Sequence, residues 1–147
     1  MTVPALVIAD AIVTALNAAT LTTPVTFTRV YVPKFDLADA IAVQGKVVPK
    51  SDAREMGSAS ADNATVAVDI GVMKRLQEAV VDEKAEFDGI LDLCEEIKAV
   101  LNRERLVGAE EAVCTGTAQE MPYSVDDADD RVFLAVITAT FLTTVTV

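Results

Sequence analysis

Residues 131–147 read RVFLAVITATFLTTVTV and form the longest strand-like segment of the chain. It has the period-2 alternation of a β-strand and, fully extended, would measure roughly 56 Å. A compact domain of this chain length has a radius of gyration of only about 15 Å. The strand is therefore expected to bend, fray or extend beyond its own sheet, and its excess length makes it a candidate intersubunit arm.

The two faces of this strand differ along its length. Its odd positions stay largely apolar, whereas its even positions change from Val and Leu to Thr after residue 136. Because alternate residues point to opposite faces of a sheet, this pattern predicts burial on both faces at first and on one face later. The candidate contact residues in this strand are Thr138, Thr140, Thr144 and Val147.

A long amphipathic helix is predicted upstream, over residues 82–106. At 1.5 Å per residue it would span about 36 Å and cross the whole domain. Residues 107–130 follow as a surface connection with at most a short strand or turn. The apolar side of the helix carries Phe87, Ile90, Leu91, Cys94, Ile97 and Leu101, as expected of a core helix with a solvated acidic face.

The first half of the chain predicts a helix over residues 4–18 and strands over 24–33, 41–50 and 64–73. The first two strands are interpreted as a hairpin without a tight turn. The whole order, α-β-β-β-α-β, is that of a single α+β domain over residues 1–147. We expect a mixed or antiparallel sheet with both helices packed on one face and a long C-terminal strand.

Several polar positions are candidates for contacts between subunits. Residues 51–63 are small and polar and are predicted to form a mobile loop that carries Arg54, Glu55 and Met56. Arg29 lies in the first predicted strand, and Asp69 is expected to meet solvent or a neighbouring subunit. The alternatives are that Arg29 occupies an exposed strand position and that Arg54 occupies a solvated loop, although interfaces favour Arg and Met.

The composition and the net charge limit which kinds of partner this chain is expected to bind. The chain has a net charge of −11 with 52% hydrophobic and 5% aromatic residues, which predicts an aliphatic core and few stacking platforms. Because nucleic-acid affinity comes mainly from cations, specific DNA binding is disfavoured, although DNA could pass an acidic wall without sticking. We expect neither a secretory signal nor a membrane segment, and hence a soluble protein made in a cytoplasm.

The sequence offers no recognisable catalytic, cofactor or metal site, so no enzyme activity is expected. It contains no His that could activate Cys114, and Cys94 reads as a buried structural thiol. One acidic cluster lacks the ligand spacing of an EF-hand loop, and a solvated turn is favoured over a calcium site. That cluster comprises Asp126, Asp127, Asp129 and Asp130.

Four segments carry a likeness to a known family: residues 29–37 (RVYVPKFDL), 46–51 (KVVPKS), 65–76 (TVAVDIGVMKRL) and 132–138 (VFLAVIT). With the order of elements, they make the chain resemble the small tail terminator and head-to-tail joining proteins of tailed bacteriophages. The resemblance implies a ring, usually a hexamer, that caps the tail tube, stops its polymerisation and docks on the head connector.

The resemblance also implies the partners and the location. The expected partners are further copies of the chain, the tail-tube protein and the head-connector or stopper protein, in the tail or neck of a virion assembled in the host cytoplasm. Residues 51–63 and 138–147 correspond to the family's contact regions by position. Another neck or head-completion protein of the same connector is one alternative, and a monomeric peptide- or ligand-binding regulatory domain is an alternative of a different class.

Overall fold

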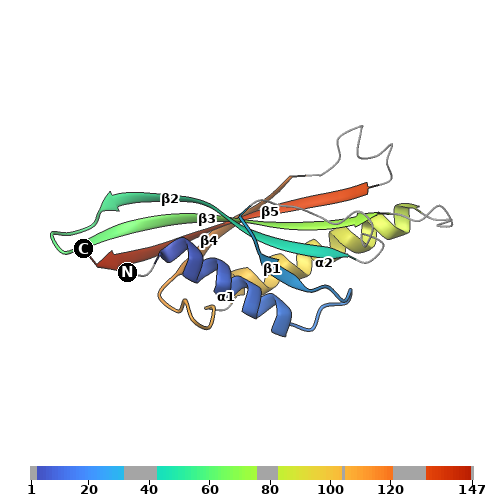
Figure 1. Ribbon diagram of the computed structural model, residues 1–147, viewed down its shortest axis with the longest axis horizontal. Coiled ribbons are helices and arrows are strands. Elements are labelled where there is room, and N and C mark those ends of the chain that lie inside the picture. The colour runs from blue at the N-terminus through green and yellow to red at the C-terminus, as the bar shows by residue number, and fades with distance from the viewer. Residues whose placement is uncertain (1–2, 32–42, 76–82, 104, 121–131, 147) are drawn as a thin grey trace.

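The computed structural model describes residues 3–31, 43–75, 83–103, 105–120 and 132–146. These ranges contain α1 (Pro4–Ala18), β1 (Phe27–Arg29), β2 (Gln44–Met56), β3 (Ala61–Arg75), α2 (Glu83–Arg103), β4 (Val113–Glu120) and β5 (Val132–Thr146). The strands form one mixed sheet in the order β1-β2-β3-β5-β4, and both helices lie on the same side of it (Figure 1). The predicted α+β class is confirmed, and β4 adds a strand to the predicted order.

Helix α1 has the bounds predicted from its periodicity. Pro4 stands in its first turn, where the missing N–H costs nothing, and the Val3 carbonyl accepts hydrogen bonds from the N–H groups of Leu6 and Val7, both at 3.1 Å. The helix buries Ile8, Ile12 and Leu16 on the side that faces the sheet. Its apolar spacing therefore places it on the sheet, as an amphipathic helix requires.

Strands β3 and β5 form the centre of the sheet and pair along their whole described length. They are antiparallel, with Ala61 opposite Thr146 at one end and Arg75 opposite Val132 at the other. The expectation that the C-terminal strand extends beyond its own sheet is therefore wrong over the described residues, because β3 is equally long. Burial follows the predicted trend, since the even positions of β5 are half-buried as far as Thr140 and Leu142 and Thr144 are exposed.

Strands β1 and β2 do not form the predicted hairpin, because they run parallel. Phe27 lies opposite Gly45 and Arg29 opposite Val47. Parallel neighbours need a connection of about a dozen residues or more, and residues 30–43 separate β1 from β2 in the sequence. In the described part of the predicted strand over 24–33, only Phe27–Arg29 forms a strand, β1, at the edge of the sheet.

Residues 51–63 do not form the predicted mobile loop. They continue β2 and β3 as an antiparallel hairpin in which Arg54 lies opposite Ala64 and Met56 opposite Asp62, and only residues 57–60 form the turn. Composition alone suggested a loop, but β5 lies beside β3 as far as Ala61 and supplies a strand on which the ribbon can continue. The end of this hairpin projects past the N-terminal end of α1 (Figure 1).

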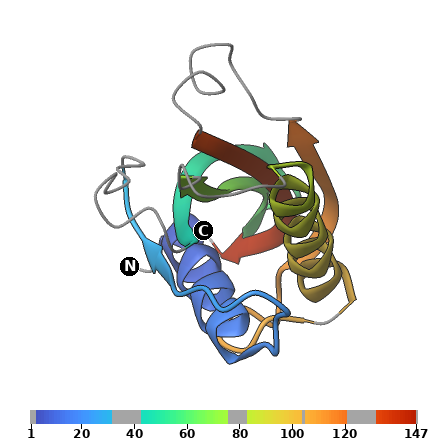
Figure 2. The same cartoon turned by 90° about the vertical axis from the view of Figure 1, so that its right-hand side faces the viewer.

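The core lies between the helices and the concave face of a strongly twisted sheet (Figure 2). Helix α2 contributes Ile90, Leu93, Cys94, Ile97 and Leu101, all buried, whereas Phe87 and Leu91 are only partly buried. Among the described residues no polar or charged side chain is buried. Within the same part of the chain, no helix is long and apolar enough to cross a membrane.

Candidate interaction surfaces

The predicted contact residues divide between the two faces of the sheet. We call the face that points away from α1 and α2 the outer face. Asp69 lies opposite Thr138, and Glu55 lies opposite Asn63, which in turn lies opposite Thr144. These strand pairings place one set of the predicted residues on the outer face. That set is Glu55, Asp69, Thr138, Thr140 and Thr144, whereas Arg54 and Met56 point to the helix side and Val147 lies outside the described residues.

Asp69 and Thr138 are brought together in the middle of the outer face. The Thr138 hydroxyl donates a hydrogen bond of 2.6 Å to Asp69 Oδ1, and Lys50 Nζ lies 3.9 Å from the same oxygen. Asp69 is half-buried, so its carboxylate needs such partners. Within one subunit, this predicted contact residue is already satisfied.

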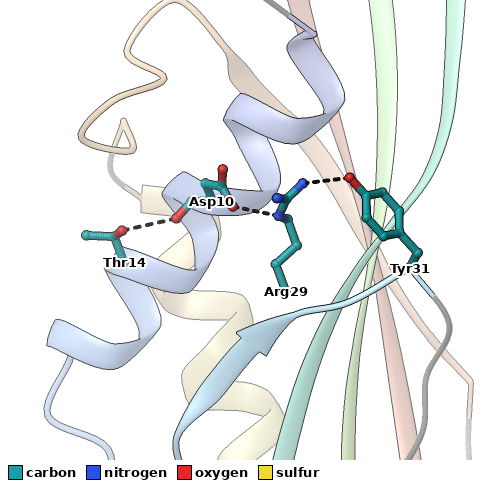
Figure 3. A network of polar contacts seen from close by, with 4 residues as sticks. All are labelled: Asp10, Thr14, Arg29 and Tyr31. Carbon is teal, nitrogen blue, oxygen red and sulfur yellow. Dashed lines mark hydrogen bonds and ion pairs between the residues drawn. The ribbon is translucent and has the colours of Figure 1, made fainter.

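Arg29 ties β1 to α1 (Figure 3). Its Nε lies 2.8 Å from Asp10 Oδ1, its guanidinium carbon lies 5.5 Å from the centre of the Tyr31 ring, and Nη1 donates to the Tyr31 hydroxyl at 3.4 Å. The Arg29 side chain is 28% exposed. Arg29 is thus committed to contacts within its own subunit, while the Tyr31 ring remains largely exposed.

The hairpin of residues 51–63, which we call the distal hairpin, carries the most exposed large apolar side chain of the described residues. Met56 ends β2 and is 84% exposed, and the neighbouring residues 51–60 are exposed as well. Arg54 is held by Asp52 through Nε–Oδ1 and Nη2–Oδ2 contacts of 2.9 and 3.0 Å. The Asp52 carboxylate raises the pKa of the Arg54 guanidinium. Strand pairing and the Arg54–Asp52 contacts therefore hold Met56 on an ordered hairpin.

Sequence reasoning missed an apolar pair on the outer face. Val113 of β4 lies directly opposite Leu142 of β5, and the two side chains are 46% and 45% exposed. Leu142 interrupts the threonine pattern of β5, which was the available signal. Val113 had no comparable signal because it lies in a segment interpreted as a connection.

A groove between the two helices was also invisible in the sequence. We call it the α1–α2 groove: it has a volume of 510 Å³ and lies between the C-terminal half of α1, the C-terminal half of α2 and residues 105–107. Small side chains leave this space between the helices. The lining residues are Thr14, Ala15, Ala18, Ala19, Ala99, Val100, Arg105, Leu106 and Val107.

A second hollow lies near the N-terminal end of α1. It has a volume of 530 Å³ and is bounded by the first turns of α1, residues 108–112 and residues 143–145 of β5. Gly108 adopts a φ of +94° in its wall, and the Glu110 carboxylate accepts the Gly108 N–H at 3.0 Å. This hydrogen bond lowers the pKa of Glu110 and fixes the wall of the hollow.

Both cysteine thiols have raised pKa values, which lower their reactivity. Burial raises the pKa of Cys94 to about 11, and burial also raises the pKa of Cys114 against the opposing effect of a backbone hydrogen bond at Gly116. Both cysteines are free. Within the described ranges no group of three or more His, Cys, Asp or Glu side chains could hold a metal ion. The predicted acidic turn at residues 126–130 lies outside those ranges.

Comparison with known proteins finds a likeness in fold but none in sequence. No family model and no curated protein matches the chain by sequence. Among solved structures, a chain from the virion of a native gene transfer agent (GTA) particle has a similar fold, with a TM-score of 0.52 over 95% of this chain and 94% of that chain. The two chains are 15% identical in sequence, so the likeness is one of fold.

Proposed function

We propose that this chain is a non-enzymatic structural protein of a phage-like virion, and specifically a ring-forming tail terminator that caps the tail tube and joins it to the head connector. The observation that carries the proposal is the likeness in fold to a gene transfer agent virion chain over nearly the full length of both chains. The four sequence segments that resemble tail terminators point the same way.

Two surface features support a role in assembly. The outer face presents an exposed apolar pair, Val113 and Leu142, and the distal hairpin presents Met56. Exposed apolar side chains that cluster mark interaction sites more often than scattered ones do. The proposed partners are further copies of the chain, a tail-tube protein and a head-connector protein, with the ring as the assembled form.

The first test is the mass of the purified protein by light scattering at two concentrations, with negative-stain images of the same sample. The second adds the protein to growing tubes of the tail-tube protein encoded by the same genome. We expect closed rings, alone or at tube ends, and tubes whose elongation stops. Binding to the head connector without binding to tubes would instead indicate another neck or head-completion protein.

A different outcome would overturn the proposal. If the protein stays monomeric at both concentrations and in the presence of tubes and connector, a virion ring is excluded. The peptide- or ligand-binding alternative would then be tested next, with the α1–α2 groove as the place to look.

A further inference from the structure

We propose that the distal hairpin of one copy inserts Met56 into the α1–α2 groove of a second copy. This inference deepens the self-assembly part of the proposed function and rests on it. The occupant is a knob made of Met56 and of Asp62, which lies opposite it in the hairpin and shares its face of the sheet. Met56 is the most exposed large apolar side chain of the described residues, at 84%, and stands at the end of a paired strand.

The groove has the shape and chemistry to receive such a knob. Its walls are Ala15, Ala18 and Ala99, with Leu106 and Val107 beside them, and its volume is 510 Å³. A methionine side chain is unbranched, has three rotatable bonds and fills irregular apolar gaps. The same contact would cover Val107, which is 78% exposed.

The knob and the groove cannot meet within one molecule. The hairpin end projects past the N-terminal end of α1 (Figure 1), whereas the groove begins at Thr14, ten residues further along that helix. Those residues alone separate the two by about 15 Å. A contact between unlike patches on two copies is heterologous, and it generates a ring when the rotation closes.

The hairpin end and the groove carry charges of opposite sign. Arg105 is the one charged residue in the described lining of the groove. Its Nη1 donates a hydrogen bond to the Glu110 carbonyl at 2.8 Å. A guanidinium has five donors in total. The hairpin end carries Asp52, Glu55 and Asp62 against Arg54, so its net charge is negative. In a chain of net charge −11, an acidic knob meeting an arginine rim lowers the repulsion between copies.

The direct test is a pair of cysteines. In a Cys114→Ser background, Met56→Cys and Ala99→Cys are introduced into one full-length chain, which is then oxidised and examined by non-reducing electrophoresis. We expect a ladder of covalent oligomers. The matched control is Met56→Cys with Ala118→Cys, where Ala118 is exposed on the outer face and should give no ladder. In parallel, Met56→Asp should weaken association about tenfold or more, whereas Met56→Leu should retain it.

Each outcome decides the inference. A ladder specific to the Met56→Cys and Ala99→Cys pair supports it, even if tubes are not capped and the terminator role fails. Wild-type rings without that ladder, and with association unchanged in Met56→Asp, overturn the inference and leave the terminator role standing. A wild-type protein that never self-associates, alone or with tubes, overturns both.

Discussion

Phe27 of β1 shows how one residue depends on residues from two other elements. It is 1% exposed, and its ring lies against Gly45 of β2, where an added Cβ would come within 2.4 Å of Phe27 Cδ1. Its backbone is held from the other side by Asn17 of α1, whose Nδ2 donates to the Phe27 carbonyl at 3.0 Å and whose Oδ1 accepts the Phe27 N–H at 2.8 Å. A side-chain amide thus replaces a neighbouring strand at the edge of β1.

Gly45 is expected to tolerate no side chain. Gly45→Ala should destabilise the fold by roughly 1–3 kcal/mol, because it overpacks the site against the Phe27 ring. Urea unfolding followed by circular dichroism measures the change. The matched control is Gly116→Ala, also in a strand, where an added Cβ meets nothing within 4 Å. Equal stability of the two variants would contradict the packing argument.

Asn17 is expected to contribute more to the free energy of unfolding than an ordinary residue on a helix surface does. Asn17→Ala removes both hydrogen bonds to Phe27 and should cost roughly 1–3 kcal/mol, since it leaves part-buried backbone groups without partners. The same unfolding measurement applies. Asn63→Ala, at an exposed strand position, serves as the control, and a loss of similar size there would argue against the edge-closing role of Asn17.

The raised thiol pKa values predict slow alkylation in the folded protein. A pKa of about 11 for Cys94 means that only about one thousandth of its thiol is ionised at pH 8, and the thiolate is the reactive form. Cys114, whose pKa is also raised, should react more slowly than a free cysteine but faster than the buried Cys94. Mass spectrometry after iodoacetamide treatment, with and without urea, checks both. Rapid native labelling of Cys94 would refute this account.

At the scale of elements, the distal part of the sheet is a three-stranded ribbon rather than a loop. There β3 is paired on both sides, with β2 and with β5, whereas β2 beyond the short partner β1 has one edge without a described partner. Open edges are where strands exchange with solvent and pair with other chains. The two strands of the hairpin should therefore differ in protection.

Amide exchange is expected to be slower at residues 61–67 of β3 than at residues 51–56 of β2 in the free protein. The reason is that β3 has ladder hydrogen bonds to two neighbours, and opening it requires both to separate. Hydrogen exchange followed by mass spectrometry, with peptides that separate the two ranges, measures this. Equally fast exchange in both would favour the mobile loop expected from composition.

At the scale of the whole molecule, the net charge of −11 opposes any contact between copies. Part of this charge lies on the exposed face of α2, which carries Asp88, Asp92 and Glu95. Like charges on exposed surfaces repel over a distance set by salt, because mobile ions screen them. Self-association should consequently depend on ionic strength as well as on the contact residues.

Raising the salt concentration from about 0.01 M to about 0.1 M shortens the screening length from roughly 30 Å to 10 Å, and we expect it to strengthen self-association. Light scattering at a fixed protein concentration follows the mass. The control is the double variant Asp88→Asn and Asp92→Asn, which lowers the repulsion and should reduce the salt dependence. Association that weakens with salt would mean that attractive ion pairs dominate the interface.

Local pattern determined much of this protein from the sequence alone. Apolar periodicity placed α1 at residues 4–18, indicated α2 and β3, and identified Cys94 as a core residue, because periodicity reports which side of a helix or strand is buried. The same reasoning located the threonine face of β5. Each of these features depends on residues close together in the chain.

The tertiary structure decided what depends on residues far apart. Composition made residues 51–63 look like a loop, but β5 beside β3 makes them a hairpin, and β1 pairs with β2 in parallel where a hairpin was expected. The partnership of Arg29 with Asp10 and the groove between α1 and α2 arise only when the helices pack on the sheet. Strand partners, strand direction and cavities are set by long-range contacts, which leave no periodic signal in a single sequence.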